Sequence, residues 1–263
     1  MVLIDFETTG LNPGFGDRVV EYAYLVIGED GVVKESAESL VFPGRRMSEG
    51  ATRTNGITDQ MLQGKSSFSE AGARLWLALE GRIMVSHNAA GFDLPCLVAE
   101  CRMAGWRLPD MQVIDSLKLT RSVWRARNHK LTTLANLVGH QGGNAHRAMA
   151  DVEAMHSVLK NLFSQFSSKF QTTQSVLSVA GVAIPSTNPK TNFSNSAAVL
   201  QQAIHNQHSV TVQYNSNSSG LSTRTITPQS VYIHANGAEY FDGYCHNRRG
   251  TRSFRVDRVI KFL

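Results

Sequence analysis

MVLIDFETTG, residues 1–10, is the stretch that decides the fold of this chain. Its first six residues form an apolar run with β-branched members, which predicts a buried strand. Asp5 and Glu7 stand two positions apart, so on a strand both side chains leave by the same face. Two neighbouring carboxylates repel each other, and a divalent cation relieves that repulsion. Because hard oxygen ligands favour Mg²⁺ or Mn²⁺, the stretch predicts a metal site, although an Asp and a Glu beside solvent would fit it too.

The composition is that of a globular protein with an uneven distribution of charge. The chain has 263 residues, of which 42% are hydrophobic and 18% charged, and its formal net charge is +5. Residues 1–163 carry 17 Lys/Arg against 18 Asp/Glu, whereas residues 164–263 carry 9 against 3. The asymmetry predicts an acidic first part and a basic second part that attracts a polyanion, although a solvated basic surface gives the same count.

Cysteine usage and hydropathy predict a cytoplasmic protein that has no contact with a membrane. Cys96, Cys101 and Cys245 show no paired spacing, so we expect neither a disulfide framework nor a zinc site. That pattern favours a reducing, intracellular compartment. We expect no signal peptide, and the longest apolar stretch, residues 176–184, is too short to span a bilayer.

Apolar periodicity and turn signals predict an α/β fold for residues 1–163. Strands at 18–27 and 32–42, joined by a turn at 28–31, are expected to pair with the first strand in a mixed sheet. The remaining elements follow from the same signals. We expect strands at 82–86 and 113–114, and helices at 58–62, 69–79, from about 94, at 131–138 and up to 163.

The composition changes after residue 163. Residues 164–196 are rich in Ser, Thr, Gln and Asn, which predicts a linker that its apolar patch at 176–184 orders in part by packing on a neighbour. A helix at 197–206 and five short strand-like runs separated by turns predict a small β-barrel. The runs are 210–214, 223–228, 230–234, 240–245 and 252–256. We therefore expect domains at 1–163 and 197–263, joined by a linker at 164–196.

Two further motifs accompany the first stretch. HNAAGFD covers residues 87–93, and HRAMAD covers residues 146–151 before the closing helix. Residues five apart on a helix are separated by about 140° around the axis, so His146 and Asp151 cannot converge within one helix. They converge if His146 lies in the preceding loop and Asp151 in the first turns. The glycines at 142–143 supply such a loop.

Together DFETTG, HNAAGFD and HRAMAD resemble the three exonuclease motifs of the DEDDh family, which includes the proofreading subunit of bacterial replicative polymerases. The resemblance covers residues 1–163 and implies an RNase H-like fold with a mixed sheet. Arg147 stands where the tyrosine-type branch has its tyrosine, so that branch is excluded. The sequence Asn55-Gly56-Ile57-Thr58 resembles the family's H-G-I-T turn with Asn in place of His, a change that we expect to leave the chemistry untouched.

The resemblance also implies the chemistry and the residues that perform it. Two divalent ions, Mg²⁺ or Mn²⁺, would stabilise the attacking and leaving oxygens of an in-line phosphoryl displacement. A histidine can take the proton of the attacking water, because its ordinary pKa lies near neutrality. Taken alone, Asp93 would more often be a helix N-cap and His146 merely solvated. The implied metal ligands are Asp5, Glu7, Asp93 and Asp151, the implied general base is His146, and the implied substrate contacts are Thr8, Leu11 and Asn88.

The C-terminal part resembles a WYL domain, a small Sm-like barrel. Glu239-Tyr240-Phe241 replaces the tripeptide that names this family, whereas residues 243–258 fit its ending. Strand alternation places Arg252 and Arg255 on opposite faces, so not every arginine can face one ligand. The resemblance implies a basic and aromatic ring that binds nucleic acid or a nucleotide-like ligand, formed by Tyr214, Tyr240, His246, Arg248, Arg249, Arg252 and Arg255.

The sequence thus predicts a metal-dependent 3′→5′ exonuclease whose partner is single-stranded or 3′-ended DNA. The WYL-like domain would assist binding or regulation, and a homodimer is left open. An exoribonuclease of the same family is an alternative, because contact with a 2′-OH depends on pocket details that motifs do not reveal. A WYL-type ligand-sensing regulator is another, although a protein that only binds has no need for four carboxylates and a histidine.

Overall fold

The computed structural model describes residues 1–13, 16–143, 146–184, 194–216, 220–233 and 238–263. Contacts divide the chain into two compact units. The first unit comprises Met1–Leu11 and Arg18–Thr187, and the second comprises Asn12–Asp17 and Asn188–Leu263. Within the described residues, no helix has the length and apolar character needed to cross a membrane.

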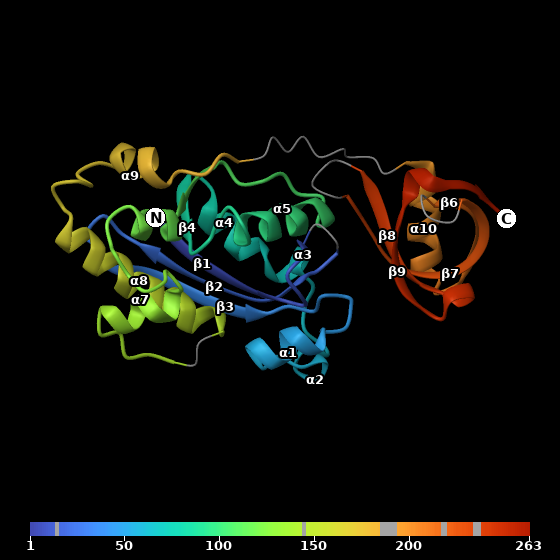
Figure 1. Ribbon diagram of the computed structural model, residues 1–263, viewed down its shortest axis with the longest axis horizontal. Helices are drawn as coiled ribbons and strands as arrows, with labels where there is room; N and C mark the ends of the chain where they lie inside the picture. Colours follow the sequence, from blue (N-terminus) through green and yellow to red (C-terminus); the bar gives the residue numbers. More distant parts are fainter. Residues whose placement is uncertain (14–15, 144–145, 185–193, 217–219, 234–237) are drawn as a thin grey trace. The chain divides into compact units, whose positions relative to one another are not determined.

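A five-stranded mixed sheet in the order β3-β2-β1-β4-β5 forms the centre of the first unit (Figure 1). The strands are β1 (Val2–Thr8), β2 (Val19–Ile27), β3 (Val33–Leu40), β4 (Arg82–Ser86) and β5 (Met111–Asp115). β1, β2 and β3 pair antiparallel, whereas β4 and β5 continue the sheet parallel to β1. Because parallel neighbours end at the same edge, the first motif and the loop after β4 meet there.

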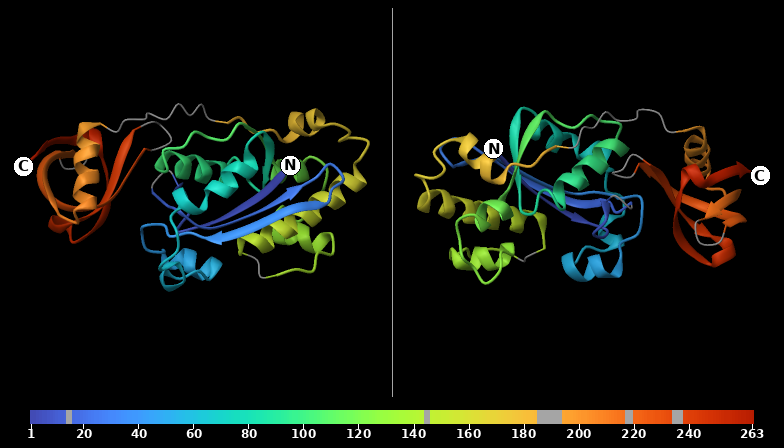
Figure 2. Two further views of the ribbon diagram at one scale, coloured as in Figure 1. Left: turned by 180° about the vertical axis from the view of Figure 1, so that it is seen from behind. Right: turned by 45° about the horizontal axis from the view of Figure 1, so that its top comes forward.

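Helices cover both faces of this sheet (Figure 2). They are α1 (Glu49–Asn55), α2 (Asp59–Leu62), α3 (Phe68–Ala71), α4 (Ala73–Leu79), α5 (Asp93–Met103), α6 (Ser116–Arg121), α7 (Leu131–Leu137), α8 (Ala148–Gln165) and α9 (Thr173–Ala180). Val2, Ile4 and Phe6 of β1 pack in the core with α3, α4 and α5, whereas Leu3 packs in the core with α8 and α9. The mixed α/β fold agrees with the prediction, but α1, α6 and α9 were not foreseen.

The first unit extends past the predicted boundary at residue 163. Phe170, Val176 and Ala180 are buried in the core that α8 covers. Gly181 then forms an isolated antiparallel bridge with Ile114 of β5. The predicted linker at 164–196 therefore contains folded chain, because its apolar residues complete this core. Residues 185–193 of that segment lie outside the described part of the chain.

The second unit is a small β domain, as predicted. Its antiparallel sheet has the order β10-β6-β7-β8-β9, and its core cluster also includes buried residues of α10. The elements are α10 (Asn195–His205), β6 (Val210–Ser216), β7 (Gly220–Ile233), β8 (Glu239–Cys245), the 3₁₀ turn η2 (His246–Arg248), β9 (Gly250–Arg255), η3 (Val256–Arg258) and β10 (Val259–Phe262). Two predicted strands are one strand, β7, with an irregularity between Pro228 and Ser230, and β10 was not foreseen. The predicted end at His234 lies outside the described residues.

Candidate active site

Strand alternation aims the first two carboxylates at α8. Leu3, Asp5 and Glu7 occupy alternate positions of β1, and Leu3 packs in the core with α8. Asp5 and Glu7 are half-buried on that same face. The carboxylates of the first motif therefore lie on the face of the sheet that α8 covers.

The start of α8 brings His146 and Asp151 to these carboxylates. α8 begins at Ala148, so Asp151 lies in its first turn and His146 in the preceding loop, which is the arrangement that their spacing required. The His146 backbone N–H donates to Asp151 Oδ2 at 3.0 Å. One ligand atom from each of Glu7, His146 and Asp151 lies within 4.8 Å of the others. These three groups could hold a metal ion.

Asp93 enters the site from the opposite layer. It is the first residue of α5, just after β4, and its side chain is 1% exposed. The N-cap of α5 is Phe92, so Asp93 does not act as the cap. Ser86 Oγ donates to Asp93 Oδ2, whereas Asp93 Oδ1 is buried and accepts no hydrogen bond from any described residue. A buried carboxylate oxygen without a donor suits a cation, so this donor set fits a divalent metal.

The electrostatics of the metal-free site oppose ionisation. Burial is the main cause, and it raises the pKa of Glu7 to about 7 and the pKa of Asp93 to about 7. Burial followed by the charges of Asp93, Asp151 and Glu7 raises the pKa of Asp5 well above its ordinary value. Burial also raises the pKa of Asp151, which the His146 N–H hydrogen bond opposes. A divalent cation would reverse these shifts by favouring the ionised carboxylates.

The predicted substrate contacts differ in how they are presented. Leu11 is 80% exposed after the end of β1. Thr8 is buried, and its hydroxyl donates to the Gly10 carbonyl. Asn88 has a left-handed backbone with φ of 72°, and its N–H donates to Asp115 Oδ1 at 3.1 Å. Of the three, Leu11 and Asn88 are exposed.

Asn55, which stands where the resembled turn has a histidine, lies beside Glu7. It closes α1 and is 6% exposed. A hydrogen bond from its side chain lowers the pKa of Glu7, against the effect of burial. Its Oδ1 also accepts the Ile57 N–H at 3.0 Å. This turn therefore supports a carboxylate of the site directly.

Sequence reasoning also missed Glu21 of β2. The β1–β2 register places Glu21 directly opposite Glu7, and Glu21 is 2% exposed. Its carboxylate binds the Arg147 guanidinium and the Ala148 N–H. The sequence did contain one signal, because Glu21 is a single glutamate in the otherwise apolar run VVEYAYLVI. Side chains alternate along a strand, so Glu21 lies on the same face as Ala23.

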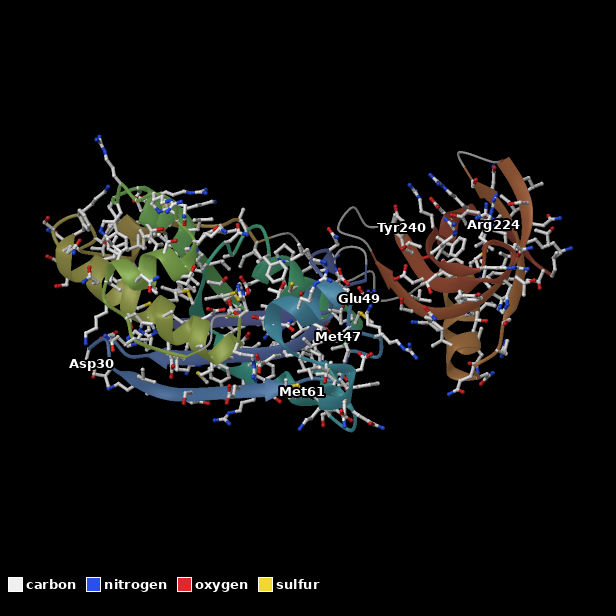
Figure 3. The ribbon with its side chains drawn as sticks, turned by 60° about the horizontal axis from the view of Figure 1, so that its bottom comes forward. Asp30, Met47, Glu49, Met61, Arg224 and Tyr240 are labelled. Carbon is white, nitrogen blue, oxygen red and sulfur yellow. The ribbon has the colours of Figure 1, made fainter. Side chains whose placement is uncertain are left out.

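The aromatic candidates of the second unit divide between its core and its surface. Tyr214 is 4% exposed, and its hydroxyl accepts the Arg255 N–H at 3.0 Å. Its ring centre lies 5.0 Å from the Arg224 guanidinium, so this buried tyrosine is not available to the ligand-binding ring that the resemblance implied. Tyr240 is half-buried, and the Arg255 guanidinium lies 5.9 Å from its ring. Figure 3 labels Tyr240 and Arg224 on the strands of this unit.

The basic candidates do not share one face either. In the β8–β9 register, Arg252 stands opposite Gly243 and Arg255 stands opposite Tyr240, so the two arginines project from opposite faces. Arg255 also pairs with Asp257. Arg248 and Arg249 are exposed at the turn between these strands, where His246 Nε2 lies 2.8 Å from Thr227 Oγ1. The predicted ring is therefore split.

Comparison with known proteins finds one matching family model in each of the two units. Residues 2–159 match the family model described as Exonuclease, and residues 196–262 match the model of the WYL domain. The 3′-5′ exonuclease DinG of Bacillus subtilis is 33% identical over 153 residues, which are 58% of this chain and 16% of that protein. The exonuclease region of the chain thus corresponds to about a sixth of that relative's length.

Two solved structures share the fold. An exonuclease X in complex with 5′-overhanging duplex DNA has a TM-score of 0.56 at 21% identity, covering 68% of this chain and 98% of that one. An Escherichia coli ExoI–ssDNA complex has a TM-score of 0.58 at 16% identity, covering 100% of this chain and 64% of that one. The exonuclease model covers more than half of the chain, which therefore belongs to the exonuclease family.

Proposed function

We propose that the chain is a metal-dependent 3′→5′ exonuclease that hydrolyses phosphodiester bonds one nucleotide at a time. The observation that carries the proposal is the meeting of Asp5 and Glu7 on β1 with Asp93 on α5 and Asp151 on α8, beside His146. Four carboxylates at one sheet edge serve no purpose in a protein that only senses a ligand. The donor-free Asp93 Oδ1 supports a metal ligand role.

Each residue has a distinct role in the proposed reaction. Asp5, Glu7, Asp93 and Asp151 would hold two Mg²⁺ or Mn²⁺ ions, which supply charge stabilisation for the attacking and leaving oxygens. His146 would accept the proton of the attacking water through its ring, which lies outside the helix and is exposed. Leu11, exposed after β1, would pack against the terminal base.

A basic segment between the second and third motifs supports nucleic acid as the substrate. Residues 116–147 contain six Lys/Arg and no Asp/Glu, whereas residues 1–115 contain 10 against 16. Its exposed members Arg121, Arg125, Arg127 and Lys130 take part in no ion pair among the described residues. Although the net charge of residues 1–163 is close to zero, this segment therefore forms a cationic surface.

The same segment is tied to the site. His87 of the second motif donates through Nε2 to the His129 carbonyl at 2.8 Å, and its Nδ1 lies 2.9 Å from Ser116 Oγ. Burial lowers the pKa of His87, which favours the neutral ring in this bridge. Cations held beside the site in this way would contact the backbone phosphates of the substrate strand.

We propose DNA as the substrate, because the two structures compared above are complexes with DNA. RNA is the second candidate, since a 3′-exonuclease that recognises a histone mRNA stem-loop also shares the fold, with a TM-score of 0.54. The test is to incubate 5′-labelled single-stranded DNA, duplex DNA and RNA side by side with Mg²⁺ or Mn²⁺. We expect DNA with a free 3′ end to be shortened fastest. Faster shortening of RNA would make the chain an exoribonuclease.

A further inference from the structure

One buried carboxylate holds the chain on the C-terminal side of His146. Glu21 accepts Arg147 Nε at 3.0 and 3.1 Å and Arg147 Nη2 at 2.5 Å. It also accepts the N–H of Ala148, the first residue of α8, at 3.0 Å. Glu21 is 2% exposed, whereas the Arg147 side chain is 42% exposed. This carboxylate therefore binds a guanidinium and a helix N-terminus at once.

His146 itself has a backbone conformation that needs support. Its φ is 65°, in the left-handed region that non-glycine residues seldom adopt. Its side chain is exposed, so packing contributes little to the orientation of the ring. Its N–H is held by Asp151, and the two residues that follow it are held by Glu21. The backbone on both sides of the imidazole is thus fixed by carboxylates.

We propose that Glu21 and Arg147 are positioning residues that hold His146 in this left-handed conformation, with its ring beside Glu7 and Asp151. The inference rests on the proposed role of His146 as general base. Glu21 reaches the site because β2 pairs with β1 and places it opposite Glu7. Its two oxygens are occupied by Arg147 and Ala148, which distinguishes it from Asp93, whose Oδ1 accepts no donor from the described residues.

A structural role for the ion pair makes a different prediction from a positioning role. Removing one partner of a buried pair leaves an uncompensated charge, whereas removing both is often close to neutral for stability. The first variant is therefore the double substitution Glu21→Gln with Arg147→Met in the full chain. We expect thermal unfolding close to that of the wild type and kcat lower by about 10- to 100-fold, because small misplacements of a catalytic group are costly. KM and the affinity for Mn²⁺ in titration calorimetry should change little.

The decisive step is to repeat the double substitution in a His146→Ala background. If the pair acts through His146, the double substitution lowers kcat no further there. A further loss would overturn the proposal, as would full activity of the folded double variant alone. Weaker Mn²⁺ binding by that variant would instead make Glu21 part of the metal site. If His146→Ala alone kept full activity, the proposed general base would fail separately.

Hydrogen exchange tests the positioning role without any reading of activity. The N–H groups of His146 and Ala148 are both held by carboxylates, so the double substitution should speed their exchange while leaving the core strand β1 protected. Unchanged exchange at both amides would overturn the proposal even if His146 proved not to be the base.

Two variants serve as matched controls. Arg18→Met with Glu100→Gln removes a second buried pair of the described residues, in which Glu100 is 2% exposed, and its effect on kcat should add to that of His146→Ala. Arg74→Met breaks an exposed pair with Glu35 and should change neither stability nor kcat appreciably. Suppression of the effect of Arg18→Met with Glu100→Gln by His146→Ala would show that the loss of any buried pair acts through His146, which would count against the proposal.

Discussion

The two units of the chain both contain a five-stranded sheet, but their candidate residues are arranged in opposite ways. In the first unit, Asp5 and Glu7 leave one strand end, while Asp93 and Asp151 lie in the first turns of α5 and α8. In the second unit, Tyr214, Tyr240, Arg252 and Arg255 lie within antiparallel strands, so alternation divides Arg252 from Arg255 and buries Tyr214. Residues at strand and helix ends converge, whereas residues spread along strands are divided between two faces.

The largest effects should arise where the side chains converge. His146→Ala should lower kcat by about 10²–10⁴-fold with metal binding largely intact, because it removes a general base. Asp151→Asn should lower the rate and weaken metal binding as well. Steady-state kinetics with Mn²⁺ titration calorimetry separates the two roles. Equal loss of metal by both variants would show that His146 is a ligand, as its place within 4.8 Å of Glu7 and Asp151 oxygens would also permit.

A smaller effect should follow from the buried amide beside Glu7. The Asn55 hydrogen bond lowers the pKa of Glu7, which burial raises to about 7. Asn55→Ala should raise that pKa, so half-maximal Mn²⁺ binding should shift upward by about one pH unit, given roughly 1.5 kcal/mol for a hydrogen bond to a charged group. Asn55→His, which keeps a donor, is the matched control. Mn²⁺ titrations at several pH values test this prediction. An unchanged pH dependence for Asn55→Ala would contradict the inference that Asn55 stabilises the ionised form of Glu7.

The same raised pKa fixes the sign of the pH dependence of stability in chelator. The pKa of Glu7 is higher in the folded protein than its ordinary value of 4.5, so folding favours the protonated acid. Its contribution to stability is therefore complete below about pH 4.5 and is lost as the pH rises through about 7.

The smallest effects should separate the two basic regions. On long single strands, with His146→Ala preventing cleavage, we compare Ala substitution of Arg121, Arg125 and Arg127 with Ala substitution of Arg248, Arg249 and Arg252. Each lost phosphate contact should reduce the slope of log K against log salt by about 0.7. We expect both sets to lower the slope, and only the first set to weaken binding of very short oligonucleotides. An unchanged slope for the second set would mean that the WYL domain does not hold the strand.

Much of the first unit could be predicted because its signals are local. Alternation in residues 1–8 fixed a buried strand with Asp5 and Glu7 on one face, and the five-residue spacing of His146 and Asp151 required a loop before the helix. The motifs lie at the ends of elements, so errors of one or two residues in the element bounds did not alter their convergence.

The rest depended on contacts between residues that are distant in the sequence. Glu21 and Arg147 stand 126 positions apart, so the sequence gives no indication that they form an ion pair. Tyr214 carries the same aromatic signal as Tyr240, yet Tyr214 is buried in the core, where Phe254 and Arg224 pack against its ring. The single strand β7 was read as two because Pro228 interrupts the pattern at a register shift.

The most direct test of the account is a time course on a 5′-labelled linear oligonucleotide, with a circular single strand of the same sequence alongside. In Mg²⁺ or Mn²⁺ we predict a ladder that shortens by one nucleotide at a time from the 3′ end, an intact circle, and no cleavage in EDTA, because the clustered carboxylates then repel the phosphate. Full activity in EDTA would remove the metal site from the mechanism. Efficient cutting of the circle would show endonuclease activity and contradict the account.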